Sequence, residues 1–368
     1  MGDMPVYLDN NATTPLRESA ITGMLDAMGP PANPSSVHSF GRSARSVVES
    51  AREAVATLAG CSPENVVFTS GGTESNNLVL AQYDNVITSA IEHDSVRHVH
   101  DRCQLIAVDE NGIVDLDQLA AKLSLIDDAL KPNTIISVMA ANNETGVIQP
   151  IGQIAEMARR SNLAFHSDMV QVFGKSHLDF TNSEISYASF SAHKIGGPTG
   201  VGALLVRSGC RLASLLRGGG QEQGRRSGTE NLIGIAGFGA AAADALGEID
   251  HYNKMAAWRD DFETRMLDER DGIAVFGKSV PRLGNTSCIA AAGKAAEAMV
   301  IAFDLAGVAI SAGSACSSGK VRSSHVLEAM GVGESAGEAV RISGGWATVK
   351  SDFETLADVF LRLYKQSA

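Results

Sequence analysis

The sequence predicts an α/β protein with a mainly parallel sheet and a second, smaller α+β domain. The first observation is a series of short apolar runs typical of strands, at residues 66–70, 86–89, 105–108, 134–139, 163–166, 186–190 and 202–206. The second is that helical patterns at 116–123 and 151–161 separate some of these runs, as in parallel sheets whose strands are joined by helices. The third is a change of pattern at about residue 256, where a long helix leads into short strands.

The composition is that of a globular protein. The chain has 368 residues, of which 44% are hydrophobic and 20% are charged, which is enough for one large domain and a smaller one. We expect residues 15–255 to form the large domain, and residues 1–14 with 256–368 to form the small domain. The formal net charge of −12 and the lack of a Lys or Arg run argue against a nucleic-acid-binding protein.

The chain shows no pattern of a secreted or membrane protein. Residues 1–5 include no basic or apolar stretch of the kind that opens a secretory signal. The uncharged run 232–243 is shorter than the roughly 20 residues that a membrane span needs. We therefore expect a cytoplasmic protein that neither spans nor binds a membrane.

Two polar, turn-forming segments precede the first long helix. Residues 5–15 begin with a short apolar run and continue into polar residues, which is typical of an extended arm that ends at a site. Residues 33–38 are a second turn-rich segment. We expect a helix at 41–60, because its apolar residues lie on one face: Val47, Val48, Ala51, Ala54, Val55 and Leu58.

The strand at 66–70 is followed directly by Gly71, Gly72 and Thr73, and then by a helical stretch. A strand, a glycine pair, a hydroxyl group and a helix start are typical of an anion-binding cradle, because the free N–H groups of the first turn face the ligand. A glycine pair before a helix is also common as a simple turn.

Polar residues follow the next strands along the chain. His93 comes after the strand at 86–89, Asn143 after 134–139, and Asp168 and Gln171 after 163–166. Ligands of parallel sheets bind beyond the carboxyl ends of the strands. We therefore expect these side chains to belong to one site.

Lys194 is the candidate catalytic residue. The strand at 186–190 ends in Ser191-Ala192-His193-Lys194 and breaks into a loop rich in glycine, so the lysine is constrained at a strand end. Lysine forms a Schiff base with an aldehyde, and pyridoxal phosphate enzymes need one beside a carboxylate that holds the pyridine nitrogen. Asp168 is the natural partner, although a solvated lysine and a helix-capping aspartate are the ordinary alternatives.

The last third of the chain predicts the small domain. We expect helices at 258–269 and 295–306, strands at 287–291 and 308–311, and a glycine- and serine-rich segment at 313–324. The last helix has a predicted capping box formed by Ser351 and Glu354.

The chain predicts neither disulfides nor a metal site. The cysteines are odd in number and scattered, without a C-x-x-C pair: Cys61, Cys103, Cys210, Cys288 and Cys316. His93, His98 and His100 are close in sequence, but no carboxylate or thiol pattern completes a metal site. Cys316 differs from the other four cysteines because its glycine- and serine-rich surroundings predict an exposed, mobile thiol.

Segments spread over nearly the whole chain together resemble the cysteine desulfurases, which are pyridoxal phosphate enzymes of the class V aminotransferase group. The matching segments, in family order, are 7–14 (YLDNNATT), 33–38 (NPSSVH), 69–76 (TSGGTESN), 142–146 (NNETG), 191–194 (SAHK), 218–222 (GGGQE), 226–231 (RSGTEN) and 313–319 (GSACSSG). The resemblance implies fold type I of the pyridoxal phosphate enzymes. In that fold the large domain has a mainly parallel, seven-stranded sheet, and here the smaller α+β domain would carry the catalytic cysteine loop.

For the cofactor, the resemblance implies that Lys194 holds pyridoxal phosphate covalently. Asp168 would contact the ring nitrogen and Gln171 the ring hydroxyl, while His93 would stack on the ring and assist proton transfer. The implied phosphate ligands are Gly72, Thr73, Ser191 and His193, joined by Thr229 from the other subunit of a homodimer.

For the reaction, the resemblance implies that Asn143 and Arg341 bind the substrate carboxylate, a task that suits the planar fork of arginine. Cys316 would attack the sulfur of bound L-cysteine and keep it as a persulfide, leaving L-alanine. Segment 313–325 resembles the long loop of the desulfurases that supply sulfur for iron–sulfur cluster assembly and tRNA thiolation. The implied partner is therefore a sulfur-acceptor protein such as an iron–sulfur scaffold. The alternatives are another class V enzyme, a selenocysteine lyase or an aminotransferase, and a non-catalytic scaffold.

The chain departs from the family pattern at a few positions. Met169 replaces a small residue, Thr199 stands where lysine is common, and Arg322-Ser323 replaces an acidic residue and a proline. After Arg341 the run 342–348, which includes Gly344-Gly345-Trp346, also differs. None of these changes removes a predicted catalytic group, but they affect the acceptor-facing loop and the substrate pocket.

Overall fold

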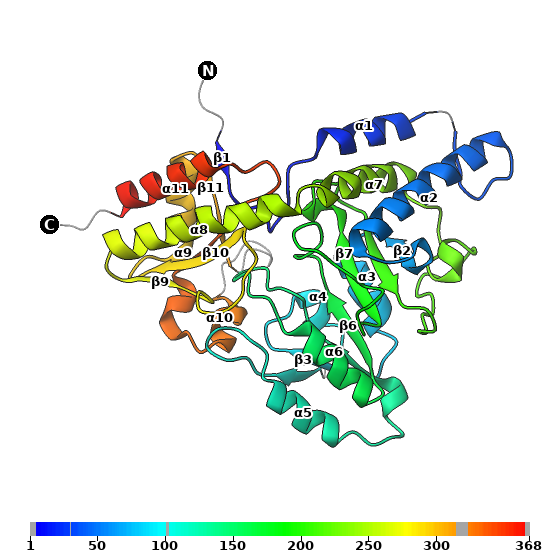
Figure 1. The fold of residues 1–368 in the computed structure, drawn as a ribbon, viewed down its shortest axis with the longest axis horizontal. Helices are drawn as coiled ribbons and strands as arrows, with labels where there is room; N and C mark the ends of the chain where they lie inside the picture. Colours follow the sequence, from blue (N-terminus) through cyan, green and yellow to red (C-terminus); the bar gives the residue numbers. More distant parts are fainter. Residues whose placement is uncertain (1–4, 30, 101–102, 314–322, 365–368) are drawn as a thin grey trace.

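A computed structural model describes residues 5–29, 31–100, 103–313 and 323–364. Figure 1 shows a large sheet covered by helices and, beside it, a smaller sheet that lies under the long helix α8 (Ile249–Glu269). The N-terminal arm runs from the small-sheet side to the large sheet, and the last helix, α11 (Lys350–Leu363), also lies on the small-sheet side.

The large sheet has seven strands in the order β2-β8-β7-β6-β5-β3-β4. The strands are β2 (Val66–Thr69), β3 (Asn85–Ser89), β4 (Gln104–Ile106), β5 (Thr134–Ser137), β6 (Ala164–Asp168), β7 (Tyr187–Ser191) and β8 (Gly202–Val206). Only β8 is antiparallel to its neighbours, and the other pairings are parallel. The predicted fold class is confirmed, and the ends of β3, β5, β6 and β7 meet at one edge of the sheet.

Helices pack on the large sheet and on one another. They are α1 (Glu18–Ala27), α2 (Ser39–Ala59), α3 (Gly72–Leu80), α4 (Asp94–Arg97), α5 (Leu116–Ser124), α6 (Ile151–Arg160) and α7 (Leu232–Leu246). A Cβ on Gly239 of α7 would lie 2.6 Å from the Cα of Ala51 in α2, so these two helices approach closely. Within the described residues no single helix is long and apolar enough to cross a membrane, and α7 with α8 meets that test only as a pair bent by 67°.

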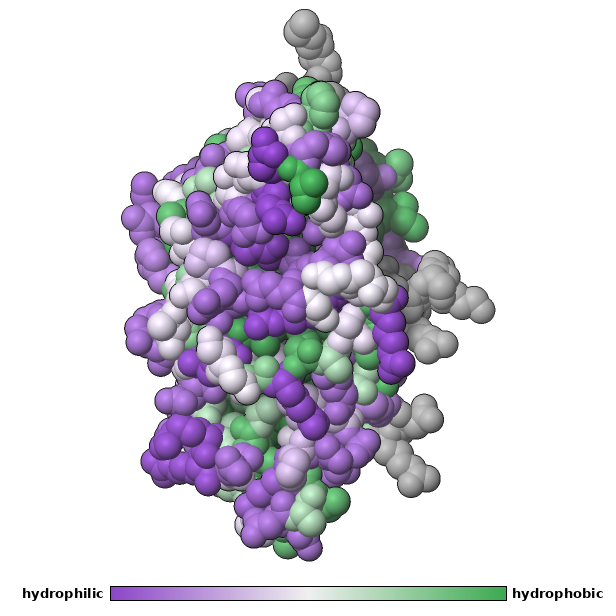
Figure 2. All heavy atoms as spheres, turned by 90° about the vertical axis from the view of Figure 1, so that its right-hand side faces the viewer, coloured by the Kyte–Doolittle hydropathy of each residue, from purple (hydrophilic) through white to green (hydrophobic). Residues whose placement is uncertain are grey.

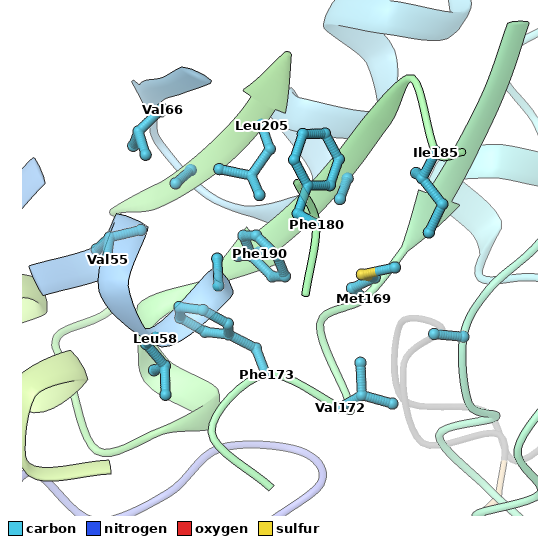
Figure 3. Packing of buried hydrophobic residues seen from close by; sticks show 14 of the residues in the cluster. Val55, Leu58, Val66, Met169, Val172, Phe173, Phe180, Ile185, Phe190 and Leu205 are labelled. Atoms are coloured by element: carbon cyan, nitrogen blue, oxygen red, sulfur yellow. The ribbon is translucent and has the colours of Figure 1, made fainter. Parts of the chain in front are cut away.

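Aromatic side chains support the turn that follows β6. Phe173 stacks on Phe190 of β7 with ring centroids 4.2 Å apart, and its edge meets Phe238 of α7. Figure 3 shows Phe173 and Phe190 among apolar side chains from several elements, with Met169 in the same cluster. Met169 therefore packs in the core, which explains why a large residue is accepted at this position.

The small sheet has four antiparallel strands, in the order β12-β13-β10-β9. They are β9 (Ile273–Val275), β10 (Thr286–Ala291), β12 (Ser311–Ala312) and β13 (Ala339–Ser343), with α8, α9 (Ala296–Leu305), α10 (His325–Ala329) and α11 (Lys350–Leu363) beside them. The arm joins this part of the protein, since β1 (Val6–Tyr7) pairs with β11 (Val308–Ala309) and Leu8 lies in a separate apolar core. The domain limits at residues 14 and 255 remain a prediction.

Three local predictions for the small-domain region were wrong. The long helix begins at Ile249 instead of 258, and the strand expected at 308–311 is broken into β11 and β12, which join different sheets. Ser351 does not cap α11, because the helix already begins at Lys350 and the carboxylate of Asp352 accepts the Val349 N–H at 2.9 Å. The actual N-cap, Val349, lies two residues before the predicted one.

A buried carboxyl group links the ends of β3 and β5. Oε1 of Glu92 accepts a hydrogen bond from the Ser89 hydroxyl at 2.6 Å and another from the Met139 N–H at 2.8 Å. Its Oε2 is buried and has no hydrogen-bond partner among the described residues. Burial, with a smaller contribution from Asp168, raises the pKa of Glu92 from 4.5 to about 8.

This shift predicts how the stability of the protein depends on pH. Between pH 4.5 and 8 the folded state holds a proton on Glu92 that the unfolded state has lost, so stability falls as pH rises, by up to about 1.4 kcal/mol per pH unit. Glu92→Gln mimics the protonated group. We expect it to match the wild type at about pH 5 and to exceed it in urea unfolding at about pH 9. Glu110→Gln, at an exposed position, is the control, and a pH-independent effect of Glu92→Gln would contradict the prediction.

Candidate active site

One cavity of about 250 Å³ lies where the ends of the central strands meet the N-terminal arm and β13. Ten of the twelve predicted site residues line it: Gly72, Thr73, His93, Asn143, Asp168, Gln171, Ser191, His193, Lys194 and Arg341. The other lining residues are Asn11, Ala12, Asn76, Ser95, Met139, Ala141 and Val170. Residues from distant parts of the sequence are therefore gathered around one space.

The cradle predicted after β2 is present at the start of α3. Gly71 has φ of 153°, a conformation that favours glycine, and a Cβ on Gly72 would lie 2.9 Å from the Val170 side chain. The N–H groups of the first helical turn have no acceptor within the helix and point out of its end. This end of α3 lines the cavity through Gly72 and Thr73, so it can bind an anion.

Lys194 also lines the cavity and contacts the arm. It ends a short 3₁₀ turn after β7, and its Nζ donates to the backbone carbonyl groups of Asn11 and Ala12, the latter at 2.7 Å. The same loop is tied to the arm by the Thr14 N–H, which donates to the His193 carbonyl at 2.9 Å. Burial and the charge of Lys194 lower the pKa of His193 to about 4, so this imidazole is neutral at neutral pH.

Asp168 and His93 are joined by a short polar chain. Asn76 donates to Oδ2 of Asp168 at 2.8 Å and to the Ser95 hydroxyl at 2.9 Å. The hydroxyl group and the N–H of Ser95 lie 2.7 and 3.1 Å from Nδ1 of His93. Because Nδ1 accepts that N–H, the ring proton of neutral His93 is on Nε2. Sequence reasoning gave no role to Asn76 or Ser95, although Asn76 lies in one of the matching segments.

Arg341 stands between the arm and the chain segment that leads to Cys316. Its guanidinium donates to Asp9 at 2.6 Å and to the Asn143 carbonyl at 3.3 Å, while its Nε is buried without a partner among the described residues. In the small sheet Arg341 is paired with Ser311 of β12. The segment after β12 therefore starts close to the cavity.

Asn11 is the main site residue that the sequence did not single out. Its side-chain amide donates to the Asn143 carbonyl at 3.1 Å and to the Thr286 hydroxyl at 2.9 Å. Its backbone carbonyl accepts from Lys194 and from Gln171. The only sequence signal was its place in the matching segment 7–14.

The unusual run after Arg341 fastens the arm. The indole of Trp346 donates to the Pro15 carbonyl at 3.0 Å, and the guanidinium of Arg17 lies 4.8 Å from the centre of the Trp346 ring. A Cβ on Gly345 would lie 2.1 Å from the Asn10 side chain, so glycine is required there. The departure from the family pattern thus supports the arm and does not line the cavity.

Two predicted site residues are not placed in this cavity. Thr229 is exposed on the surface and does not line it, so its role in the site of another subunit stays a prediction. Cys316 lies outside the described residues. No group of three or more His, Cys, Asp or Glu side chains arranged to hold a metal is found in the described part of the chain.

Comparison with known proteins places the chain in a family. The family Aminotransferase class-V matches residues 6–356. A cysteine desulfurase of Gluconacetobacter diazotrophicus is 39% identical over 96% of this chain and 92% of its own length. Cysteine desulfurase IscS of Dictyoglomus turgidum is 36% identical over 98% of this chain and 95% of its own.

A solved structure agrees with these relatives. A NifS-like protein from Rickettsia africae superposes with a TM-score of 0.90 at 34% sequence identity, covering 98% of this chain and 99% of that protein. The family match, residues 6–356, spans both sheets and the arm, so it includes every element that lines the cavity. The chain belongs to the class-V aminotransferase family, among its cysteine desulfurases.

Proposed function

We propose that this protein is a pyridoxal phosphate-dependent cysteine desulfurase that converts L-cysteine to L-alanine. The observation that carries the proposal is the convergence of Lys194, Asp168, His93 and the start of α3 on one cavity, in a chain similar to cysteine desulfurases over nearly its whole length. Sulfur would leave on Cys316 as a persulfide, for delivery to an acceptor protein such as an iron–sulfur scaffold.

The residues around the cavity fit pyridoxal phosphate. The start of α3 with Ser191 and His193 supplies neutral donors for a phosphate, and Asp168 supplies a fixed carboxylate for a protonated ring nitrogen. Oδ1 of Asn76 is buried without a partner among the described residues. When bound, this cofactor supplies an electron sink for bond cleavage at the substrate.

The protein's own residues then have separate tasks. Lys194 would hold the cofactor covalently, Gln171 would donate to the ring hydroxyl, and His93 would stack on the ring. The Ser95–Asn76–Asp168 chain keeps His93 and the carboxylate in fixed relative positions. With its proton on Nε2, His93 can donate a hydrogen bond or pass a proton there.

Arg341 is suited to bind the carboxylate of L-cysteine. A guanidinium has five N–H donors, and Asp9 and the Asn143 carbonyl occupy only part of them. The buried Nε without a partner leaves a hydrogen-bonding demand that a substrate carboxylate can satisfy. Asn143 lines the cavity beside Arg341 and would complete this contact.

The four described cysteines are poor candidates for the sulfur-accepting thiol. Burial raises the pKa of each of them: that of Cys61 goes to about 12, and those of Cys103, Cys210 and Cys288 also rise. Since the thiolate is the nucleophile, these side chains are held in the unreactive form. Cys316 remains the candidate, as its sequence surroundings predict.

A homodimer would complete the site. Thr229 is exposed and does not line the cavity of its own chain, in keeping with a contact to a second subunit. The outer face of α1 exposes Ile21, Leu25 and Met28, whose spacing puts them on one side of the helix. Figure 2 shows one face of the molecule, where hydrophobic residues are exposed in places between hydrophilic ones.

The cofactor assignment is tested by labelling. We expect borohydride reduction of the protein loaded with pyridoxal phosphate to fix the cofactor on the peptide that contains Lys194, because no other lysine lines the cavity within the described residues. Peptide mapping by mass spectrometry is the measurement, and Lys278→Met, at an exposed position, is the control. A label on a different lysine would show that the assignment is wrong.

The role of Cys316 is tested by replacing it with serine. Cys316→Ser should bind pyridoxal phosphate normally but release no sulfide from L-cysteine, since cofactor binding does not need the thiol and removal of the sulfur does. In the wild type without reductant, one added sulfur should appear on the peptide that contains Cys316. Cys61→Ser is the matched control and should keep full turnover. Normal alanine and sulfide production by Cys316→Ser would rule out this mechanism.

The shared site is tested with mixed dimers. A Lys194→Ala subunit paired with a Thr229→Ala subunit should have one site with both groups and one site with neither. We expect this pair to regain about half of the wild-type activity, while each variant alone stays weak. Activity equal to the mean of the two variants, or an active monomer in sedimentation, would contradict the shared site.

A further inference from the structure

Lys175 is the only buried lysine among the residues that the structure describes, with 3% of its surface exposed. It follows β6 and the turn that contains Asp168 and Gln171. Gly174, with φ of 70°, reverses the chain just before it, and a Cβ there would lie 2.9 Å from the Ile195 side chain. Phe173 is packed in the core on one side of this turn, and Lys175 is directed toward the arm.

The ammonium group of Lys175 contacts two residues of the candidate site. Its Nζ donates to Oε1 of Gln171 at 3.0 Å and to Oδ1 of Asn11 at 3.1 Å. No carboxylate lies within ion-pair distance of it in the described part of the chain. Lys175 does not line the cavity, whereas Gln171 and Asn11 both do.

These contacts determine which way the Gln171 amide points. Because Oε1 accepts from Lys175, the NH₂ group must occupy the other position, where it donates to the Asn11 carbonyl at 3.1 Å. An NH₂ group has a second N–H, which is left for a ligand in the cavity. If the amide were flipped, Oε1 would face the Asn11 carbonyl and the NH₂ group would face an ammonium.

The surroundings of Lys175 are rich in positive charge. Burial, Lys194 and Arg341 together lower the pKa of Lys175 to about 7. A buried ammonium without a carboxylate partner is costly, so a structural purpose alone does not account for it. An anionic ligand in the cavity would offset part of that cost.

We propose that Lys175 is a positioning residue that orients the Gln171 amide toward the cofactor. Through its second hydrogen bond it also fixes the side chain of Asn11, whose backbone carbonyl accepts a hydrogen bond from Lys194. This proposal rests on the pyridoxal phosphate site proposed above. Lys175 would act through Gln171 and Asn11 and would not touch the cofactor itself. Removal of the Lys175 ammonium group should therefore affect only the properties of the site that depend on Gln171 or Asn11.

The test is a double-mutant cycle on cofactor affinity. Lys175→Met keeps the length and apolar stem of the side chain but removes the ammonium, and Gln171→Leu removes the amide. We expect each single change to weaken pyridoxal phosphate binding by about tenfold, as for loss of a charge-assisted hydrogen bond. The double variant should bind pyridoxal phosphate no more weakly than the single variant with the lower affinity. Titration of the apoprotein, followed by visible absorbance, measures the affinities.

Further measurements separate positioning from loss of folding. Lys175→Met should unfold at the same or a higher temperature than the wild type as apoprotein, because a buried charge is removed. Lys175→Arg keeps the charge and the donors and should recover part of the lost affinity. Lys278→Met is the exposed control and should bind the cofactor like the wild type.

The outcomes distinguish this inference from the function on which it rests. If the effects of Lys175→Met and Gln171→Leu on affinity multiply, or if Lys175→Met binds like the wild type, Lys175 does not act through Gln171 and the inference is wrong. If the wild type itself takes up no pyridoxal phosphate, the proposed function is wrong, and the inference that rests on it is wrong as well. A loss of affinity with unchanged thermal stability and a non-additive cycle would support the inference.

Discussion

The contact between the N-terminal arm and the end of the large sheet is the interaction on which the site depends. Asn11 accepts from Lys194 and Gln171 through its backbone carbonyl, and its side chain reaches Asn143 and Thr286. The arm is also paired with β11 and contributes Leu8 to the second core. One short segment thus connects the core of the small sheet to the end of the large sheet and lines the cavity, so movement of either sheet would displace Lys194.

The charge around the cavity is mainly positive, whereas the net charge of the whole chain is negative. The protein has a formal net charge of −12, but Lys175, Lys194 and Arg341 all contact the arm, and the first turn of α3 lines the same cavity. Asp168 is the acidic residue that lines this space. Such a set of groups suits a ligand that carries a phosphate, a carboxylate and a cationic ring nitrogen.

Much of the fold could be predicted because its strands are short, apolar and bounded by turn residues. The strands at 66–70, 134–139 and 186–190 appear as β2, β5 and β7 with ends shifted by no more than two residues, and their polar ends meet as expected of parallel strands. The predictions failed where tertiary contacts overrode local pattern. Ala309 and Ser311 belong to different sheets because each has a different pairing partner, Tyr7 and Arg341 respectively.

The sequence by itself determined the fold class, because alternating strand and helix patterns are local and need no knowledge of distant contacts. It indicated the chemistry only through the matching segments taken together, since each of them alone also has an ordinary structural explanation. The tertiary structure alone decided which polar side chains cooperate. Asn76 and Ser95 became a link between Asp168 and His93, and Lys175 became a buried side chain rather than a solvated one. The reason is physical: hydrogen bonding and burial depend on the three-dimensional neighbours of a side chain, and residues such as 11, 171, 286 and 341 are brought together only by folding.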